Sequence, residues 1–460
     1  MSVSSFTRLA SANAYDNALR NIQSRQTSLA NLQESLTSGK KITSPSDDPT
    51  GAAQAERAMN RIARIATDQR ALEAQRNSIQ LAEGTLGDIT NALQNFRELV
   101  VSAGNGAHTP AERKTIAGQL QGLREQILTL SNTLDSNGMP LFASLGSELK
   151  PFVGPQMSVP DYSFDGLPGQ SASDQYAIPF TLDGESAFMH QPSRDGVFNM
   201  TVSNTAGQLI PTDRALVTDN IRITDNAQIA ATAATAQANA NVDFPDYQVQ
   251  FSNIVQDPAT GMTTGTYLVV ETPSDPSHTF VPVSFQYKTG EQAKIDITDI
   301  PGMAFTVTGT PPATDKGLAN ISPTSPATTV TGSPANNDVI NISFKRSVFS
   351  VLDSAITDIG SAVNANAATQ AVSQALHNID LSMARVSAVR GQAGDLLGRA
   401  DRITAANDKR TIEQEANRSR AEDMDMIKGV SDFQNQQTGY SAALQSYAQV
   451  QKLSLFNFIG

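Results

Sequence analysis

Residues 426–453 read MIKGVSDFQNQQTGYSAALQSYAQVQKL, and large apolar side chains recur in them at a fixed interval. Met426, Phe433, Tyr440 and Tyr447 are each seven residues apart. A second set with the same interval begins four residues after Met426. Alternating steps of four and three place both sets along one stripe of an α-helix, the pattern of a coiled-coil seam. The second set is Val430, Gln437, Leu444 and Gln451.

The surroundings of this stripe contain almost no charge. From Phe433 to Gly460 the one charged side chain is Lys452, and the remaining polar residues are mostly Gln, Ser and Asn. An exposed helix normally carries Lys and Glu on its solvent face. An uncharged helix can be enclosed on several sides without burying ions. We therefore expect this segment to pack among other copies of itself.

The N-terminal segment has a matching pattern. Residues 4–37 contain no Pro or Gly and predict one helix, roughly 50 Å long at 1.5 Å per residue. We expect this helix to pair with the C-terminal one as an antiparallel or side-by-side coiled coil, and the same stripes to hold other subunits. An intramolecular helix bundle alone is the plainer interpretation. The candidate assembly residues are Tyr15, Leu19, Ile22, Leu29, Leu36, Met426, Val430, Phe433, Tyr440, Leu444, Tyr447 and Leu453.

Capping signals divide the N-terminal part into three helices. Gly39 suits the position after a helix end, where φ is positive. Asp48 before Pro49 predicts an N-cap and the start of a second helix that runs to Ala103. Thr109 before Pro110 predicts the start of a third, which we expect to reach residues 137–138. Most charges of the second helix, from Arg57 to Arg76, lie off its apolar stripe, and Lys40-Lys41 is interpreted as solvated.

The middle of the chain has a different composition. Of 22 prolines, 19 fall between residues 140 and 334, where short β-rich runs alternate with Gly, Pro, Asn and Asp. This pattern predicts one antiparallel β domain or a pair of them. Residues 227–241 predict a short helix or a loop. The strands are expected at residues 197–202, 247–251, 266–270, 279–285, 294–297 and 339–344.

The helical period returns at residue 347, with Gly391, Gly394, Gly398 and Gly429 as positions where a helix could bend. The predicted fold class is α+β: long terminal helices form a coiled-coil or helix-bundle rod, and a mainly antiparallel β outer region is inserted between them. We expect assembly helices at 1–40 and 421–460. The helical rod domain is expected at 41–145 and 346–420, and the β-rich outer region at 146–345.

Composition excludes several classes of function. The chain has 460 residues, a formal net charge of −12 and a pI near 4.8, which argue against binding to nucleic acid or anionic membranes. It has no Cys, so disulfides and thiolate sites are excluded. The sequence contains no run of about 18 apolar residues, so no membrane span is predicted. The first 36 residues do not resemble a cleaved secretory signal, although export by an apparatus that reads an uncleaved N-terminus stays open.

No catalytic or cofactor motif is evident. The four histidines are far apart in sequence and form no metal-binding motif. The sequence also contains no nucleotide-binding motif and no hydrolase motif around a serine. Asp47-Asp48 could suggest a catalytic pair, but helix capping explains it more simply. We therefore expect a non-enzymatic protein without a metal or cofactor.

Two motifs carry a resemblance to a known family. Residues 36–52, LTSGKKITSPSDDPTGA, are similar to the segment LSSGKRINSPSDDP of the bacterial flagellin family. The form PSDDP at 45–49, the ending LSLFNFIG at 453–460 and the turn within 132–142 resemble the family members that stand between the flagellar hook and the filament. Met139-Pro140 departs from the family pattern of that turn. The resemblance covers residues 1–145 and 345–460.

The resemblance implies a structural role in the bacterial flagellum. It implies a subunit exported unfolded through the flagellar type III apparatus and assembled as a ring at the hook–filament junction. Its expected partners are other copies of itself, another hook-associated protein on the hook side, flagellin or its adaptor on the filament side and an export chaperone on the C-terminal helix. A flagellin-type filament subunit is the alternative, and an exported enzyme with a coiled-coil handle is a third possibility.

Overall fold

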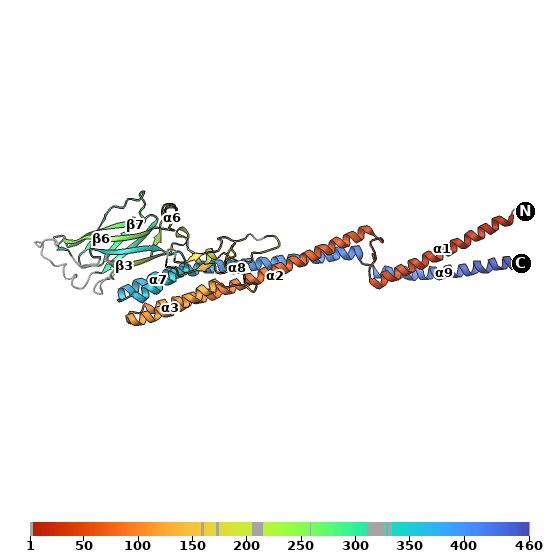
Figure 1. The fold of residues 1–460 in the computed structure, drawn as a ribbon, viewed down its shortest axis with the longest axis horizontal. Helices are drawn as coiled ribbons and strands as arrows, with labels where there is room; N and C mark the ends of the chain where they lie inside the picture. Colours follow the sequence, from red (N-terminus) through yellow and green to blue (C-terminus); the bar gives the residue numbers. More distant parts are fainter. Residues whose placement is uncertain are drawn as a thin grey trace. The chain divides into compact units, whose positions relative to one another are not determined.

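The structure is a computed structural model that describes residues 3–157, 161–171, 174–204, 215–257, 259–310, 328–329 and 334–459. The side chains of residues 3–15, 204, 328–329, 450 and 452–459 lie outside the description. The described chain has an α+β fold, with long helices in the first and last parts of the sequence and antiparallel sheets formed by the segment between those parts (Figure 1). Its long helices are α1 (Val3–Ser38), α2 (Pro49–Ala103), α3 (Pro110–Ser131), α7 (Val348–Ser361), α8 (Ala365–Glu422) and α9 (Met426–Ile459).

The chain forms two compact units. The terminal unit contains Met1–Ala71 and Asp401–Gly460, and the central unit contains Leu72–Ala400. Helices α2 and α8 each contribute residues to both units. Within the described residues, no helix is both long and apolar enough to cross a membrane.

The predicted helix starts are confirmed. Gly39 has a φ of +70°, and the Asp48 side chain accepts hydrogen bonds from the backbone N–H groups of Thr50 and Gly51, at 3.1 and 3.0 Å. Thr109 and Glu112 form a capping box at the start of α3, with Pro110 in the first turn. These caps satisfy N–H groups that the first turn of a helix leaves unbonded.

The predicted end of α3 was wrong. The helix stops at Ser131, several residues before the expected end at 137–138. The Asn132 side chain donates to the Phe152 carbonyl at 2.9 Å and accepts from the Phe152 N–H at 3.0 Å. These hydrogen bonds to residue 152 turn the chain away from the helix axis. They form only in the folded protein, so the local sequence around Asn132 does not predict them.

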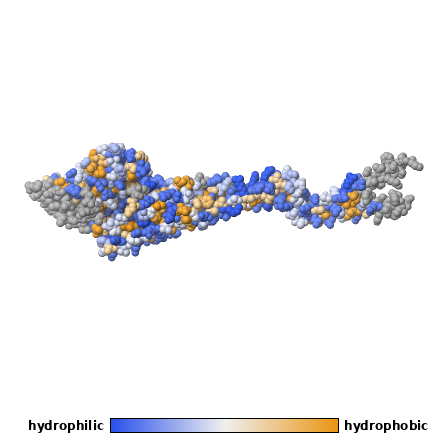
Figure 2. All heavy atoms as spheres, viewed as in Figure 1, coloured by the Kyte–Doolittle hydropathy of each residue, from blue (hydrophilic) through white to orange (hydrophobic). Residues whose placement is uncertain are grey.

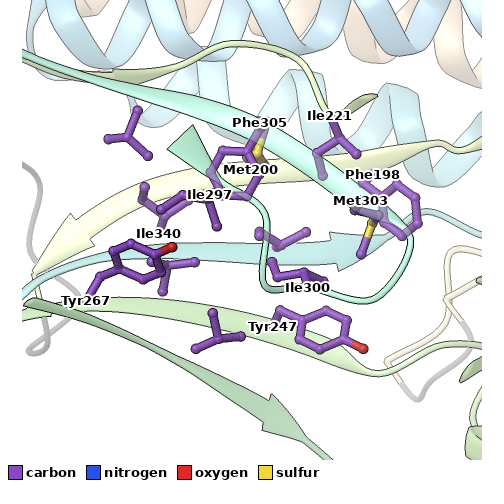
Figure 3. Close-up of a cluster of buried hydrophobic side chains, with 14 of the residues drawn as sticks. Phe198, Met200, Ile221, Tyr247, Tyr267, Ile297, Ile300, Met303, Phe305 and Ile340 are labelled. Atoms are coloured by element: carbon purple, nitrogen blue, oxygen red, sulfur yellow. The ribbon is translucent and has the colours of Figure 1, made fainter. Parts of the chain in front are cut away.

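The β region packs two antiparallel sheets on one core. One sheet has the order β3-β12-β6-β7-β8, with β11 beside β6, and the other has the order β4-β10-β5, with β9 beside β10. Side chains of both sheets, including Met200, Tyr247, Phe305 and Ile340, meet in the cluster drawn in Figure 3. The strands are β3 (Phe198–Asn204), β4 (Ala215–Thr218), β5 (Arg222–Ile223), β6 (Asp246–Asp257), β7 (Met262–Thr272), β8 (Val283–Lys288), β9 (Ala293–Ile297), β10 (Met303–Thr310), β11 (Thr328–Thr329) and β12 (Asp338–Phe344).

Six predicted strands are present, and one starts later than predicted. β8 begins at Val283, after Pro282, and not at Thr279. β10, the central strand of the second sheet, was not predicted: its first five residues are all buried, so it lacks the alternation that marks a half-exposed strand. A further pair, β1 (Phe152–Val153) and β2 (Ser163–Phe164), is short. The smaller helices are α4 (Gly184–Phe188), α5 (Pro192–Asp195) and α6 (Asn226–Ala240), the last within the segment predicted as helix or loop.

Candidate assembly interface

The first and last helices pair antiparallel in the terminal unit. A Cβ added at Gly429 would lie 3.0 Å from Leu36 Cδ2, and one at Gly439 would lie close to Arg25 Nη1. Because the contacts move forward along α9 as they move backward along α1, the two helices run in opposite directions, and Figure 1 shows them side by side. The predicted pairing is confirmed as the antiparallel alternative.

A short antiparallel β-bridge joins the residues that follow α1 to the residues between α8 and α9. The Lys41 N–H donates to the Glu422 carbonyl at 2.8 Å, and the Met424 N–H donates to the Gly39 carbonyl at 2.9 Å. The Lys40 ammonium forms an ion pair with Glu422, and Lys41 Nζ donates to the Arg420 carbonyl at 2.8 Å. Both lysines are exposed, as their interpretation as solvated predicts, and both also bind the end of α8.

The two acids of the PSDDP segment bind backbone amides. Asp47 accepts hydrogen bonds from the N–H groups of Thr43 and Ser44, at 3.1 and 2.8 Å, and Asp48 caps α2. The Ser44 N–H bond lowers the pKa of Asp47 most, and the Gly51 N–H bond does the same for the pKa of Asp48. Hydrogen bonds that favour the charged carboxylate have this effect. The capping interpretation is confirmed for Asp48, whereas Asp47 holds the loop before the helix.

Gly429 and Gly51 allow close approach and were not recognised as such. At Gly429, which was predicted as a bend, α9 is continuous and a Cβ would lie 2.7 Å from Met424 Cε. At Gly51 a Cβ would lie 2.6 Å from Ile42 Cδ1, and Ile42 is buried. Helix α8 is likewise continuous through Gly391, Gly394 and Gly398. Glycine spacing alone does not distinguish a bend from a tight packing contact.

The predicted stripe is incompletely covered. Leu19, Met426, Val430 and Leu444 are 38%, 48%, 45% and 42% exposed. The half-buried members are Ile22, Leu29, Leu36, Phe433, Tyr440 and Tyr447. Gly429 is the one described residue of α1 or α9 that is buried. Tyr15 and Leu453 lie outside the described side chains.

The α1–α9 contact is also hollowed. A groove of about 530 Å³ between the helices is lined by residues of both, among them Arg25, Gln436 and Tyr447. Figure 2 shows hydrophobic residues at the surface of this pair, whereas hydrophilic residues dominate on the part of the terminal unit that α2 and α8 form. Two helices therefore leave both an open groove and exposed apolar side chains.

A buried cluster in the central unit has the order of contacts of a serine hydrolase. His190 Nδ1 lies 3.6 Å from Asp195 Oδ2, and His190 Nε2 lies 3.2 Å from Ser382 Oγ. Burial lowers the pKa of His190, against the effect of Asp195. Burial acts to raise the pKa of Asp195, but the nearby His190 ring and hydrogen bonds from Arg194 and the Gln191 N–H hold it well below its usual value. Ser382 is completely buried and its hydroxyl donates to the Asn378 carbonyl at 2.8 Å, so a substrate has no access to it. The cluster holds α5 against α8.

No group of three His, Asp or Glu side chains in the described ranges is arranged to hold a metal ion. The feature of the terminal unit that could support a function is the partly covered stripe of α1 and α9.

The N-terminal helical part of the chain is similar to that of bacterial flagellins. Residues 10–146 match the family model described as the bacterial flagellin N-terminal helical region. The chain is also similar to flagellar hook-associated protein 3 of Salmonella typhimurium, with 33% identity over 153 residues, which are 32% of this chain and 46% of that protein. The corresponding protein of Escherichia coli K12 is 34% identical over 146 residues, 30% of this chain and 44% of that protein.

A solved structure shows the same fold. The crystal structure of the flagellar junction protein FlgL from Legionella pneumophila has a TM-score of 0.53 and 22% identity, and the match covers 80% of this chain and 100% of that one. The chain spans about half the length of the curated relatives it matches. These similarities confirm the resemblance to the flagellin family that the two sequence motifs predict.

Proposed function

We propose that this protein is a structural subunit of the bacterial flagellum that joins the hook to the filament as a ring of copies. The observation that carries the proposal is the stripe of α1 and α9, which stays partly exposed when the two helices pair. The names of the two curated relatives and of the solved junction protein support the place in the flagellum.

The energetics of the helix pair favour assembly with neighbours. Complete burial of one Leu or Tyr is worth roughly 1.5–3 kcal/mol, and the stripe residues of α1 and α9 obtain only part of it. Two isolated helices are marginally stable, and neighbours that bind only the folded pair would stabilise it by mass action. The few charges on α9 let several copies enclose it at little cost in ion desolvation.

The proposed partners follow from the same surface. They are other copies of this chain, another hook-associated protein at the hook side, flagellin at the filament side, and an export chaperone that covers α9 before assembly. We propose export through the flagellar type III apparatus, location at the hook–filament junction, and no enzymatic activity. A filament subunit of the flagellin type is the alternative function.

The location of the protein on isolated flagella tests the proposal. Gold-labelled antibodies against this chain are expected to mark one band at the hook–filament boundary, and the protein is expected as a trace component of purified flagella. Label along the whole filament with a major protein band would establish the filament alternative. Flagella without label would contradict both functions.

A further inference from the structure

In the terminal unit, α2 and α8 pack along a narrow seam. Gln69 Nε2 donates to Thr404 Oγ1 at 3.0 Å, Asn407 Nδ2 donates to Gln69 Oε1 at 3.1 Å, and Arg61 Nη1 donates to Gln414 Oε1 at 3.5 Å. These contacts set an antiparallel register. One set of covered positions recurs in steps of four and three, as in a heptad seam, from Gly51 to Gln69 in α2 and from Ile403 to Gln414 in α8, and Ala421 follows Gln414 by seven residues. The positions of this set are Gly51, Ala55, Ala58, Ile62, Ile65 and Gln69 in α2, and Ile403, Asn407, Arg410, Gln414 and Ala421 in α8.

Basic side chains gather on one side of this seam. Arg57, Arg61 and Arg64 are exposed and each directly precedes a covered position of α2. Arg420 directly precedes Ala421 of α8. Arg57, Arg61 and Arg420 line one groove of about 330 Å³, whose remaining polar lining consists of the amides of Gln54, Gln414 and Asn417. These four arginines are the basic face; no carboxylate lines its groove, and the exposed Glu413, which directly precedes the covered Gln414, lies on the same side.

Acidic side chains recur on the opposite side. Asp401, Asp408, Glu415 and Glu422 of α8 are seven residues apart and form the acidic stripe. The last three directly follow the covered positions Asn407, Gln414 and Ala421. A residue that follows a seam position and one that precedes it flank the seam on opposite sides, because each residue turns the helix by about 100°. The acidic stripe therefore lies on the other side of the helix pair from the Arg420 groove.

The central members of both sets are available. Asp408 and Glu415 are exposed, and neither forms an ion pair with the part of the chain that the structure describes. Arg57 and Arg64 are exposed and equally without a carboxylate partner among the described residues. Each pair is one heptad apart, which corresponds to about 10 Å along either helix. The contact between Arg61 and Gln414 shows that the two pairs lie at similar heights along the unit.

We propose that the basic face of one copy binds the acidic stripe of the next copy, with Arg57 against Glu415 and Arg64 against Asp408. Copies with a common orientation place α2 of one antiparallel to α8 of the other, so the two spacings match. The two faces lie on opposite sides of the unit. Each contact therefore leaves the acidic stripe of one copy and the basic face of the other copy free to bind further copies. Such a head-to-tail contact generates a closed ring or a helix.

The contact sets orientation more than affinity. Exposed ion pairs contribute little binding energy each, but like charges placed opposite each other exclude a wrong neighbour. A copy that presented the same face to its neighbour would oppose arginine to arginine or carboxylate to carboxylate. The apolar stripe of α1 and α9 would supply affinity, and the charged faces would select the neighbour.

Cysteine cross-linking tests the contact directly, because the natural chain has no Cys. Arg57→Cys and Glu415→Cys are made as separate full-length variants and expressed together or singly in cells that lack their own copy. After mild oxidation of isolated flagella, a disulfide-linked dimer is expected only when both variants are present. Dimers of either variant alone, or no dimer in the mixture, would overturn the proposal.

Charge reversal tests whether the attraction selects the neighbour. Arg57→Glu with Arg64→Glu, and Asp408→Arg with Glu415→Arg, are each expected to reduce incorporation about tenfold or more, because like charges then face each other. The quadruple variant is expected to restore incorporation. A matched control for the arginine pair is Lys288→Glu with Lys294→Glu, which lowers the net charge by the same amount on exposed sites of the β region and should leave incorporation unchanged.

This inference rests on the proposed assembly function, and the outcomes separate the two. A wild-type protein found at the junction, together with charge-reversed variants that incorporate normally or a quadruple variant that does not recover, overturns the charged contact alone. A wild-type protein absent from flagella overturns the proposed function, whatever the variants do.

Discussion

Leu444 connects the α9 stripe to the proposed assembly. It is 42% exposed in the single chain, although the heptad pattern puts it at a seam position. A side chain that is half covered in the monomer and needed in the assembly should affect the two states differently. Its replacement by a charged residue should therefore spare folding and block association.

Leu444→Asp is expected to reduce incorporation into flagella at least about tenfold, because one lost apolar contact of 1.4 kcal/mol corresponds to that factor. The far-ultraviolet circular dichroism of the purified chain should stay close to that of the wild type. Tyr440→Asp is expected to behave in the same way. The matched control is Gln445→Asp, which adds the same charge at the next, exposed position. Equal incorporation of Leu444→Asp and Gln445→Asp would refute the role of the stripe.

His190 makes the stability of the central unit depend on pH. Burial lowers its pKa in the folded chain, whereas in the unfolded chain the imidazole titrates near 6.5. The unfolded state therefore binds more protons below about pH 6.5, and the free energy of unfolding falls as the pH falls. The loss is at most about 1.4 kcal/mol per pH unit, the value for one proton.

Urea unfolding between pH 7.5 and 5.5 is expected to show a steeper loss in the wild type than in His190→Gln. His377, whose pKa burial also lowers, is present in both proteins, so its contribution cancels in the comparison. Parallel pH profiles for the two proteins would show that His190 accepts a proton without cost in the folded state.

At the scale of elements, caps and seams decide where the helices lie. Thr109→Ala removes the capping box of α3 and is expected to destabilise the central unit by about 1 kcal/mol. Thr109→Ser keeps the hydroxyl and should retain most of the stability. Thermal unfolding of both variants measures the difference, and an Ala variant as stable as the Ser variant would count against a stabilising cap.

The elements that the sequence predicts are those with local signals. The starts of α2 and α3 follow from Asp48 and Thr109, whose side chains bind amides within the same turn. The pairing of α1 with α9 follows from their repeats, whereas its antiparallel direction is seen only in the structure. The end of α3 depends on Asn132 meeting Phe152, and the break between α8 and α9 follows the contact of Lys40 with Asp423. Contacts between distant segments leave no local signal.

The candidate interface was predicted in part. The stripe on α1 and α9 is visible in the heptads, but the exposure of Leu19, Val430 and Leu444 required the paired helices. The charges of α2 were predicted only to lie off its apolar stripe, and those of α8 were not recognised, because the separation into two faces depends on which residues form the seam. The partner helix determines that seam.

At the scale of the whole molecule, the two compact units should respond differently to truncation. Deleting the last 28 residues removes most of α9 but none of the central unit. The β region is expected to stay folded, with an unchanged unfolding transition and unchanged protection from proteases, while incorporation into flagella is lost. Normal attachment of filaments in cells that carry this deletion would contradict the proposed function.

Because α1 pairs with α9, the proposed assembly surface forms only in a chain that contains both of these helices. A polypeptide whose translation stops before residue 426 leaves α1 without its companion helix. Such a fragment could fold its sheets correctly and still lack the surface that neighbours recognise. The pairing of the two chain ends would thus act as a proofreading step that keeps unfinished molecules out of the structure being built.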